Sequence, residues 1–374
     1  MLKIDACIIV KNEEPYIKSL VENLDEFCDT IYITDTGSTD KTLEILETLS
    51  SNNKKVVVSH FKWVNDFSAA RNFSFSQSKD SDYIFWCDGS DDFTKGLMMQ
   101  LKAFKRKVMS DSMPDLIEVI RKYDDLLVGM YALVKRSAGL EWHDPIHEFI
   151  DYKEDTTIKK KMFTSDALLI HRNFDTRDEA HANRNIEIFR SMDKEHKKFT
   201  SRNLMYYANE LFDHDMLLSA YLMYQEAMRN YDNFLSPGEV ILCFVKMCVC
   251  YNVGEKRNNL DDLISKGEKL YNHGYKNDLF LACLGDLYFA KNEWKKAIRV
   301  YEEALVHKNN EMFLTELIAW NIDTLYIKSQ LLLIYTTIEE YGKANEVNEQ
   351  VLKSDPKNEI ALKNREYFKS KIWD

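Results

Sequence analysis

The stretch Tyr83-Ile84-Phe85-Trp86-Cys87-Asp88-Gly89-Ser90-Asp91-Asp92 decides the fold of this chain. An apolar run that predicts a short buried strand leads directly into three carboxylates. Open α/β sheets place their ligands at the carboxyl ends of strands, which is where these carboxylates fall. Clustered carboxylates between small residues can hold a hard divalent cation, and that cation can hold a diphosphate. The alternative is a solvated Asp/Gly/Ser turn, which is the commoner case for such a stretch taken alone.

The residues before this stretch alternate strand and helix patterns. Apolar, β-branched runs predict strands at Ile4–Val10, Thr30–Thr34 and Val56–His60. Helical spacing or a helix-start signal predicts helices at Glu13–Phe27, Lys41–Ser50 and Asp66–Gln77. This rhythm predicts an α/β domain with a mostly parallel sheet and right-handed crossovers.

After about residue 115 the rhythm changes to strands without intervening helices. The expected strands are Leu116–Arg121, Gly129–Lys135, Ile146–Tyr152 and Ala167–His171, with the first two antiparallel. They predict a mixed-sheet extension that could close over a ligand. We expect the complete α/β domain, with its mixed and mostly parallel sheet, to span residues 1–175.

Residues 176–374 are predicted to be helical throughout, with a repeat of about 34 residues that is typical of tetratricopeptide helix pairs. Copies lie near 201–234, 237–272, 278–311 and 325–358. The best copy matches at seven positions: Leu281, Leu284, Gly285, Tyr288, Ala297, Tyr301 and Ala304. We therefore expect an all-α domain of tetratricopeptide-like repeats. The alternative is a generic helical bundle in which the register arises by chance.

Composition narrows the class of protein. The formal net charge of −11, from 50 basic and 61 acidic residues, argues against a nucleic-acid partner. The seven cysteines form no Cys-x-x-Cys pair, so we expect free thiols in a reducing compartment. No apolar run is long enough to span a bilayer, and the first residues do not resemble a signal peptide. These features predict a cytoplasmic protein without a membrane span.

Three loops follow predicted strands: Val10–Glu14, Asp35–Ser38 and Asp88–Asp92. In a doubly wound sheet they line the same edge. Asp35 can accept hydrogen bonds from a base or ribose, the first loop can hold the base, and the acidic cluster can hold the diphosphate. The sequence contains neither GxGxxG nor GxxxxGK[ST], so a dinucleotide or P-loop site is disfavoured.

The first 110 residues resemble the GT-A nucleotide-sugar domain of glycosyltransferase family 2. The matching pieces are Cys7-Ile8-Ile9-Val10-Lys11-Asn12-Glu13-Glu14, Ile33-Thr34-Asp35-Thr36-Gly37-Ser38-Thr39-Asp40, Phe67-Ser68-Ala69-Ala70-Arg71-Asn72 and the acidic cluster. A tetratricopeptide tail behind such a domain is similar to the subgroup that contains the S-glycosyltransferases of glycopeptide bacteriocins, such as the sublancin enzyme.

The resemblance implies a set of residues that bind the nucleotide sugar: Val10, Asn12, Glu13, Asp35, Arg71, Asp88, Gly89 and Trp142. For two of these residues a purely structural role is the alternative: Arg71 could be a helix-surface arginine, and Trp142 could fill the core. The family commonly has Asp-x-Asp, whereas this chain has Asp88-Gly89-Ser90-Asp91-Asp92. The second metal carboxylate is therefore Asp91 or Asp92, and weakened metal binding stays open. The resemblance also makes His171 a metal ligand, although a histidine at a strand end is more often only hydrogen bonded.

The segment Trp142-His143-Asp144-Pro145-Ile146-His147-Glu148 is similar to the Trp-x-x-x-(Ile/Val)-His-Glu stretch of the same subgroup. A glutamate there can act as general base toward an acceptor hydroxyl or thiol. The catalytic candidates are Glu148, then Asp144, with His147 beside them. The alternative is a structural Glu148 that pairs with His147 or caps a turn.

Together these features predict a metal-dependent, inverting glycosyltransferase of the hexosyltransferase class. Its donor would be a UDP-sugar with Mn²⁺ or Mg²⁺ as cofactor, and its acceptor a Cys, Ser or Thr of a peptide or protein. The helical repeats could present that peptide or form a homodimer. One alternative is a saccharide or lipid-linked acceptor of the cell envelope, for which the basic run Lys159–Lys161, otherwise a solvated loop, leaves room. The other is an inactive, peptide-binding scaffold, suggested by the altered Asp spacing.

Overall fold

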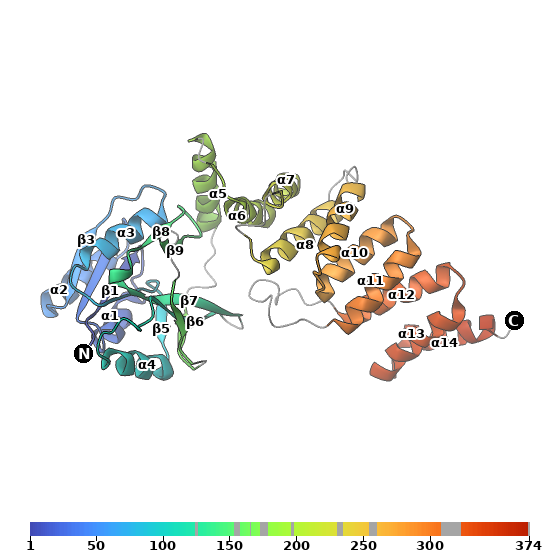
Figure 1. The fold of residues 1–374 in the computed structure, drawn as a ribbon, viewed down its shortest axis with the longest axis horizontal. Coiled ribbons are helices and arrows are strands. Elements are labelled where there is room, and N and C mark those ends of the chain that lie inside the picture. The colour runs from blue at the N-terminus through green and yellow to red at the C-terminus, as the bar shows by residue number, and fades with distance from the viewer. Residues whose placement is uncertain are drawn as a thin grey trace. The chain divides into compact units, whose positions relative to one another are not determined.

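The computed structural model describes residues 1–123, 126–152, 158–164, 166–172, 179–195, 198–229, 235–253, 260–307 and 323–372. The chain divides into two compact units, Met1–Lys197 and Lys198–Asp374. The first unit contains the sheet and the helix α5 (Glu179–Lys194), and the elements in the described part of the second unit are helices (Figure 1). Three expected repeat copies run partly outside the described residues, at 230–234, 254–259 and 308–311.

A sheet of nine strands forms the centre of the described part of the first unit. Its parallel half has the order β3-β2-β1-β4, with strands β1 (Ile4–Val10), β2 (Thr30–Asp35), β3 (Val56–His60) and β4 (Tyr83–Phe85). The helices between them are α1 (Ile17–Asp25), α2 (Thr42–Asn52) and α3 (Phe67–Gln77), as Figure 1 shows. The βαβα rhythm of the sequence is therefore confirmed.

Local sequence explains why these helices form where they do. Helix α1 buries a stripe at helical spacing, made by Ile17, Leu20, Val21 and Leu24. Helix α3 begins after Asp66, whose carboxylate accepts a hydrogen bond from the Ala69 amide at 2.9 Å. That cap satisfies an amide that has no partner within the helix. The start of α3 also sets the position of Arg71, which lies one turn farther along the helix.

The second half of the sheet continues from β4 in the order β7-β6-β11-β5. These strands are β5 (Asp91–Phe93), β6 (Leu116–Tyr123), β7 (Leu126–Lys135) and β11 (Leu168–His171), and helix α4 (Lys95–Lys105) follows β5. Strands β6 and β7 are antiparallel as expected, and the mixed-sheet extension is confirmed. Strand β11 pairs parallel with β6 and antiparallel with β5. Residue alternation is the same in both directions, so the sequence pattern does not give a strand's direction.

Three short elements differ from the sequence expectation. The expected strand Ile146–Tyr152 is reduced to β9 (Phe149–Tyr152), which pairs with β8 (Leu140–His143) in a separate two-stranded sheet. The basic run expected to be a loop contributes to β10 (Lys160–Met162), which pairs with β6 and has exposed side chains. Strand β5 was not expected at all, because its acidic residues lack a β-type pattern.

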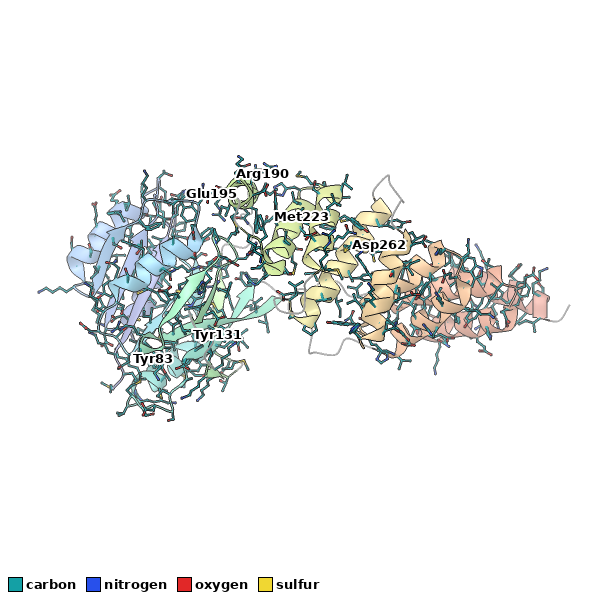
Figure 2. The ribbon with its side chains drawn as sticks, turned by 45° about the horizontal axis from the view of Figure 1, so that its top comes forward. Tyr83, Tyr131, Arg190, Glu195, Met223 and Asp262 are labelled. Carbon is teal, nitrogen blue, oxygen red and sulfur yellow. The ribbon has the colours of Figure 1, made fainter. Side chains whose placement is uncertain are left out.

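Figure 2 shows the side chains of the sheet and of the helices, and each unit has a core of buried hydrophobic residues. Tyr83 of β4 and Tyr131 of β7 are both labelled there, on neighbouring strands. The Tyr83 hydroxyl donates to the Pro114 carbonyl at 2.5 Å, and the Trp86 indole donates to the Tyr131 carbonyl at 2.5 Å. These bonds fix the segment that leads from β4 into the acidic cluster.

The second unit consists of helices arranged along the chain in Figure 1. They are α6 (Ser201–Asp213), α7 (Leu217–Ala227), α8 (Pro237–Val253), α9 (Leu260–Asn272), α10 (Asp278–Ala290), α11 (Trp294–Val306), α12 (Thr324–Thr337), α13 (Tyr341–Ser354) and α14 (Glu359–Ile372). Eight of them form one helix pair in each expected repeat copy, and α14 follows the last. Small residues sit where paired helices approach, for example Ala297 and Ala304, which are buried. The expected all-α repeat architecture is confirmed.

Gly285 in α10 shows how close this approach is. A Cβ on Gly285 would lie 2.5 Å from the ring of Tyr301 in α11. That ring is fully buried, and its hydroxyl donates to Asp286 at 2.5 Å, so it has little room to move. A side chain at position 285 therefore forces the helix pair apart.

We predict that Gly285→Ala destabilises the second unit by about 1–3 kcal/mol, because overpacking outweighs the gain in helix propensity. The control is Gly342→Ala in α13, where an added Cβ meets nothing within 4 Å. That change should be neutral or stabilising by up to about 1 kcal/mol. Urea unfolding followed by circular dichroism measures both, and equal midpoints would contradict the tight contact.

No helix in the described ranges is both long enough and apolar enough to cross a bilayer. All seven cysteines lie in those ranges, and each is a free thiol; six are buried and Cys283 is half-buried.

Candidate active site

An acidic turn joins β4 to β5 and is closed by its own residues. The Asp88 amide donates to the Asp91 carboxylate at 2.8 Å, and the Asp91 amide donates to the Asp88 carbonyl at 3.1 Å. Asp91 is also the register partner of His171 in the antiparallel pair of β5 and β11. The His171 Nδ1 atom lies 2.9 Å from Asp91 Oδ1. Sheet pairing therefore brings together residues that are 80 positions apart in the chain.

Asp92 lies apart from this cluster. Its carboxylate accepts from Asn23 of α1 at 3.0 Å and pairs with Arg172. Successive side chains of a strand point to opposite faces, so β5 directs Asp91 and Asp92 to different sides of the sheet. Among the described residues, the group whose ligand atoms all lie within 4.8 Å of one another is Asp88, Asp91 and His171. Asp92 is not in that group.

Two buried arginines hold the acidic cluster. Arg71 donates from Nη2 to Asp88 Oδ1 at 3.0 Å, and Arg121 donates from Nη1 to Asp88 Oδ2 at 2.7 Å. The Nη2 atom of Arg121 also donates to Asp91 at 2.6 Å. Both arginine residues are only 6% exposed, so these pairs are poorly screened by solvent. Arg71 is thus a buried site residue and not a helix-surface arginine.

Arg121 was not found from the sequence, although a signal exists. In β6 the alternate residues Ile117 and Val119 are buried, and Arg121 continues the same face two residues on. A charged residue on the buried face of a strand requires an opposite charge, because an unpaired buried charge is very costly. That requirement points to the acidic cluster.

The arginines change the acidity of Asp88. Burial alone would raise the pKa of the Asp88 carboxyl, but Arg121 and Arg71 outweigh burial and hold that pKa well below its usual range. Asp88 is therefore ionised at every physiological pH and able to hold a cation.

Two tryptophans support Arg71. Its guanidinium carbon lies 4.3 Å from the centre of the Trp86 ring and 5.0 Å from that of Trp142. The two rings meet edge to face, with centroids 4.7 Å apart. Trp142 is 4% exposed and packs in the core, where its indole nitrogen has no hydrogen-bond partner. In this structure Trp142 positions Arg71 and is covered from solvent.

The candidate base Glu148 joins the same network. Its Oε1 atom accepts from Arg71 Nε at 2.6 Å, and its side chain is 14% exposed. The loop before it contains Asp144 at φ 68° and His147 at φ 52°, backbone conformations that cost energy for residues other than glycine. Such strain often accompanies function. The His147 ring stacks on Phe189 of α5, with centroids 6.2 Å apart. Arg71 thus connects Glu148 to Asp88.

The first and second loops are bound to each other. Asn12, at φ 59°, accepts through Oδ1 from the Thr39 amide at 2.7 Å, and its own amide donates to Ser38 at 2.9 Å. The Val10 carbonyl accepts from the Thr36 amide at 3.0 Å. Asp35 is buried and accepts from the amides of Gly37 at 2.9 Å and Ser38 at 3.1 Å. Asp35 therefore shapes its own loop in this structure.

Glu13 connects the first loop to the acidic turn. A Cβ on Gly89 would lie 2.5 Å from Glu13 Cγ, so only glycine permits this approach. Burial, together with the nearby charges of Asp88, Asp91 and Asp40, raises the pKa of Glu13 to about 8. Its buried Oε2 atom has no hydrogen-bond partner. Glu13 is therefore protonated at neutral pH in the metal-free protein.

This pKa predicts a pH-dependent stability. The folded state holds a proton that the unfolded state loses near the ordinary glutamate pKa, so the Glu13 contribution falls as pH rises from about 4.5 to about 8. Glu13→Gln mimics the protonated form and should remove this fall. With a chelator present, we expect the variant to be more stable than the wild type at pH 9, by roughly 1–3 kcal/mol.

Thermal melts at pH 6 and pH 9 measure the effect. Glu14→Gln is the control, because the Glu14 carboxylate accepts from the exposed Lys41 amide at 3.2 Å. This substitution should change the melting temperature by the same amount at pH 6 and pH 9. Equal pH dependence in wild type and Glu13→Gln would show that the Glu13 pKa is not raised.

The cluster has the right chemistry for a divalent ion. The two carboxylates suit Mn²⁺ or Mg²⁺, the imidazole offers a nitrogen ligand beside them, and the ligand atoms are within 4.8 Å of one another. Each carboxylate already binds a guanidinium, however, so an ion would have to take oxygens that Arg121 holds. Asp88, Asp91 and His171 can therefore hold a divalent ion if Arg121 releases the two carboxylates.

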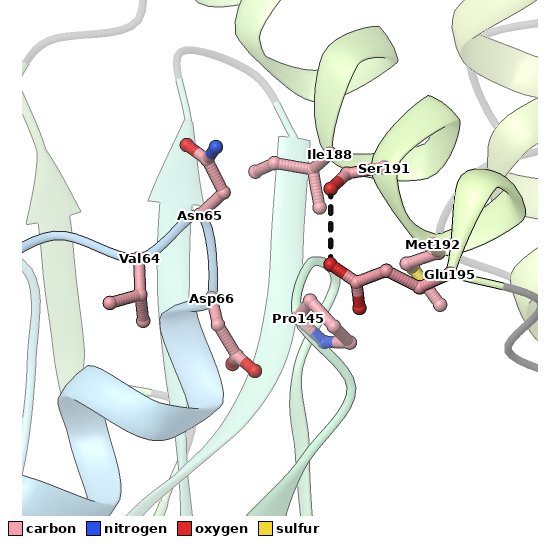
Figure 3. Close-up of a pocket in the computed structure, with 8 residues that line it drawn as sticks. All are labelled: Val64, Asn65, Asp66, Pro145, Ile188, Ser191, Met192 and Glu195. Atoms are coloured by element: carbon pink, nitrogen blue, oxygen red, sulfur yellow. Dashed lines mark hydrogen bonds between the residues drawn. The ribbon is translucent and has the colours of Figure 1, made fainter.

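A small pocket of about 80 Å³ lies beside the loop that carries the candidate base (Figure 3). Figure 3 shows Val64, Asn65 and Asp66, just before α3, across from Ile188, Ser191 and Met192 of α5 and Glu195 just after it, with Pro145 between them. The Pro145 carbonyl accepts from the Phe67 amide at 2.8 Å. The pocket does not include the acidic cluster.

Comparison with known proteins identifies the domain. Residues 5–161 match the model of Glycosyl transferase family 2. A crystal structure of S. aureus TarS 1–349 is similar at 13% identity with a TM-score of 0.37, covering 91% of each chain; another, in complex with UDP-GlcNAc, has the same identity and TM-score and covers 91% of this chain and 92% of that one.

A tetratricopeptide repeat protein from Parabacteroides merdae matches at 12% identity with a TM-score of 0.37, covering 53% of this chain and 70% of its own. No curated protein sequence matches this chain. The TM-scores are low, so it is the match of residues 5–161, which include the acidic turn, that identifies the domain. Residues 5–161, in the first unit of this chain, thus form a domain that matches Glycosyl transferase family 2.

Proposed function

We propose that this protein is a metal-dependent, inverting glycosyltransferase that moves a sugar from a UDP-sugar to a Cys, Ser or Thr of a peptide or protein. One observation carries the proposal: the buried guanidinium of Arg71 binds both Asp88 and Glu148. A diphosphate-holding carboxylate and a proton acceptor are therefore separated by one side chain. A single anomeric carbon could be reached from both sides, as direct displacement requires.

The nucleotide would lie over the three loops at the carboxyl edge of the sheet. Val10, Asn12 and Asp35 would contact the nucleoside, with Asp35 and Asn12 shaping the loops that surround it. Glu13 approaches Gly89 within the acidic turn, where ribose and diphosphate would lie. Asp88, Asp91 and His171 would hold the divalent ion, which would supply Lewis-acid stabilisation of the departing diphosphate.

The transfer chemistry needs one proton acceptor. The acceptor hydroxyl or thiol would attack the anomeric carbon while the bond from that carbon to the diphosphate oxygen breaks, releasing UDP. Glu148 would take the acceptor's proton, with Arg71 fixing its carboxylate through Oε1. Asp144 and His147 would hold the strained loop that presents Glu148.

The acceptor would approach beside this loop. The pocket next to Pro145 is lined partly by Asp66, Ser191 and Glu195, which can bind peptide groups. Stacked helix pairs such as those of the second unit commonly form a peptide-binding face, and they also form dimer interfaces. A peptide acceptor is favoured over a saccharide or lipid-linked one by the resemblance to peptide-modifying transferases, while the lysine run that leaves room for the alternative lies partly in β10 with exposed side chains. An inactive scaffold is disfavoured, because it has no use for Glu148 held against buried Arg71.

We predict that Glu148→Gln lowers the rate of sugar transfer by about 10²–10⁴-fold with little change in donor affinity. Glutamine keeps an oxygen for Arg71 but cannot accept the proton. Steady-state kinetics with saturating donor measure the effect, and Glu141→Gln, on β8 of the same unit, is the control. Full turnover by Glu148→Gln would exclude it as the base.

The experiment that tests the function is release of UDP from UDP-glucose or UDP-N-acetylglucosamine, with Mn²⁺ or with a chelator. We expect release with Mn²⁺, faster with a peptide that contains Cys, Ser or Thr, and loss of release with the chelator. Mass spectrometry of the peptide then identifies the modified atom. Sugar transfer to a saccharide and not to any peptide would support the envelope alternative, and no release from any donor would support the scaffold.

A further inference from the structure

Arg121 binds the oxygens that a divalent ion would need. Its guanidinium spans the two carboxylates of the acidic turn, with Nη1 2.7 Å from Asp88 Oδ2 and Nη2 2.6 Å from Asp91 Oδ2. The other Asp88 oxygen faces Arg71, and the other Asp91 oxygen faces His171 Nδ1 at 2.9 Å. Arg121 thus holds one oxygen of each carboxylate in the turn.

The surroundings make this competition strong. Arg121 is 6% exposed and the Asp91 side chain is fully buried, so solvent screens little of the repulsion between a guanidinium and an adjacent divalent ion. Arg71 cannot neutralise the acidic cluster by itself, because its guanidinium also pairs with Glu148, with Nε 2.6 Å from Glu148 Oε1. An ion that enters without other anions would therefore place excess positive charge among these residues.

The guanidinium is not fully satisfied where it lies. The Nε atom of Arg121 is buried and has no hydrogen-bond partner, whereas Nη1 also donates to the Tyr123 hydroxyl at 3.2 Å. A buried donor without an acceptor is costly. Phosphate oxygens offer a guanidinium paired acceptors, so a diphosphate beside the turn would relieve this cost.

We propose that Arg121 is an internal cation that occupies the divalent-ion site and that the ion must displace, so that ion and nucleoside diphosphate bind as a coupled pair. Arg121 leaves the carboxylates when the ion takes them and pairs with the diphosphate that arrives with the ion. The inference rests on the proposed function, since the diphosphate belongs to the donor. Arg121 then lowers affinity for free ion and links ion binding to the presence of donor.

The test is Mn²⁺ binding to the full chain, measured by electron paramagnetic resonance with and without UDP. For the wild type we expect weak binding of Mn²⁺ alone and a gain of about tenfold or more with UDP. Arg121→Met should bind Mn²⁺ alone at least about tenfold more tightly and lose most of the gain from UDP. Arg121→Lys keeps a positive charge and should resemble the wild type without UDP. Arg365→Met, which removes a paired arginine in the second unit, should leave Mn²⁺ binding unchanged.

Loss of Arg121 leaves the fully buried Asp91 carboxylate and the one-third-exposed Asp88 carboxylate without this partner, so thermal melts accompany the binding measurement. Mn²⁺ should raise the melting temperature of Arg121→Met more than that of the wild type, because the ion replaces the missing charge. Unchanged Mn²⁺ affinity in Arg121→Met, or an equal response of both proteins to Mn²⁺, would overturn the inference. Tighter Mn²⁺ binding by Arg121→Met in a protein that releases UDP from no donor would support displacement of Arg121 and refute the proposed function.

Discussion

Asp91→Asn should reduce donor turnover by about 10²–10³-fold and also destabilise the first unit. The Asp91 side chain is fully buried and binds Arg121, His171 and the Asp88 amide. Asparagine keeps the shape but loses the charge that balances Arg121. Breaking a buried ion pair costs about 3–5 kcal/mol, so the melting temperature should fall together with the activity.

The neighbouring variant Asp92→Asn is the matched control. Asp92 pairs with Arg172 and Asn23 on the other side of β5, and the Arg172 side chain is 44% exposed. A pair of this kind contributes less than about 1 kcal/mol, and its loss should leave turnover nearly intact. UDP-release rates and thermal melts of both variants are needed. Inactive Asp92→Asn with active Asp91→Asn would reverse the assignment of the second carboxylate.

Arg71→Met should produce the largest loss of stability in the first unit. Arg71 neutralises Asp88 and Glu148 and lies against two tryptophan rings. Methionine leaves Glu148, whose side chain is 14% exposed, without its arginine, which costs about 3–5 kcal/mol, whereas Asp88, 33% exposed, keeps Arg121. Loss of the ring contacts adds about 0.5–2 kcal/mol. Turnover should also be lost, because Glu148 is no longer fixed.

Urea unfolding followed by tryptophan fluorescence measures this effect, because Trp86 and Trp142 contact the substituted side chain. The double variant Arg71→Met, Glu148→Gln also removes the unpaired charge of Glu148. It should therefore recover about 0.5–3 kcal/mol of the free energy of unfolding that Arg71→Met loses. Lys102→Met removes an exposed ion pair with Glu26 and should cost less than about 1 kcal/mol. Additive losses in the double variant would show that Arg71 and Glu148 do not interact.

Periodicity in the sequence was sufficient for the parallel half of the sheet and for the helix pairs. The β-branched runs of β1 to β3 alternate with helical patterns, and that combination permits few arrangements. The small residues at Gly285 and Ala297 identify helix pairs because paired helices cannot approach otherwise. These patterns are local, so they can be recognised in the sequence without knowledge of the tertiary structure.

The acidic cluster was predictable only in part. The sequence placed Asp88, Asp91, Asp92 and His171 in one site, but the choice between Asp91 and Asp92 depended on β5, a three-residue strand with no sequence pattern. Once β5 forms, strand alternation directs one of them to His171 and the other to Asn23.

Burial was the other missing quantity. If the acidic cluster lay at the surface, substituting its carboxylates would change the stability of the fold little. In the structure the cluster contains two arginines that are each 6% exposed, so the same substitutions are expected to destabilise the first unit. Arg121 was missed because it lies 30 residues beyond Asp91 in the chain and is connected to it only through the sheet. Its buried partners follow from tertiary packing, which one sequence does not display.

Isothermal titration of UDP into the wild type and Asp91→Asn, with Mn²⁺ and with a chelator, tests the central claim most directly. We expect the wild type to bind UDP with Mn²⁺, and we expect binding to be strongly weakened by the chelator and in Asp91→Asn. UDP binding of equal strength under all these conditions, or none at millimolar nucleotide, would contradict a cation-dependent donor site at Asp88, Asp91 and His171.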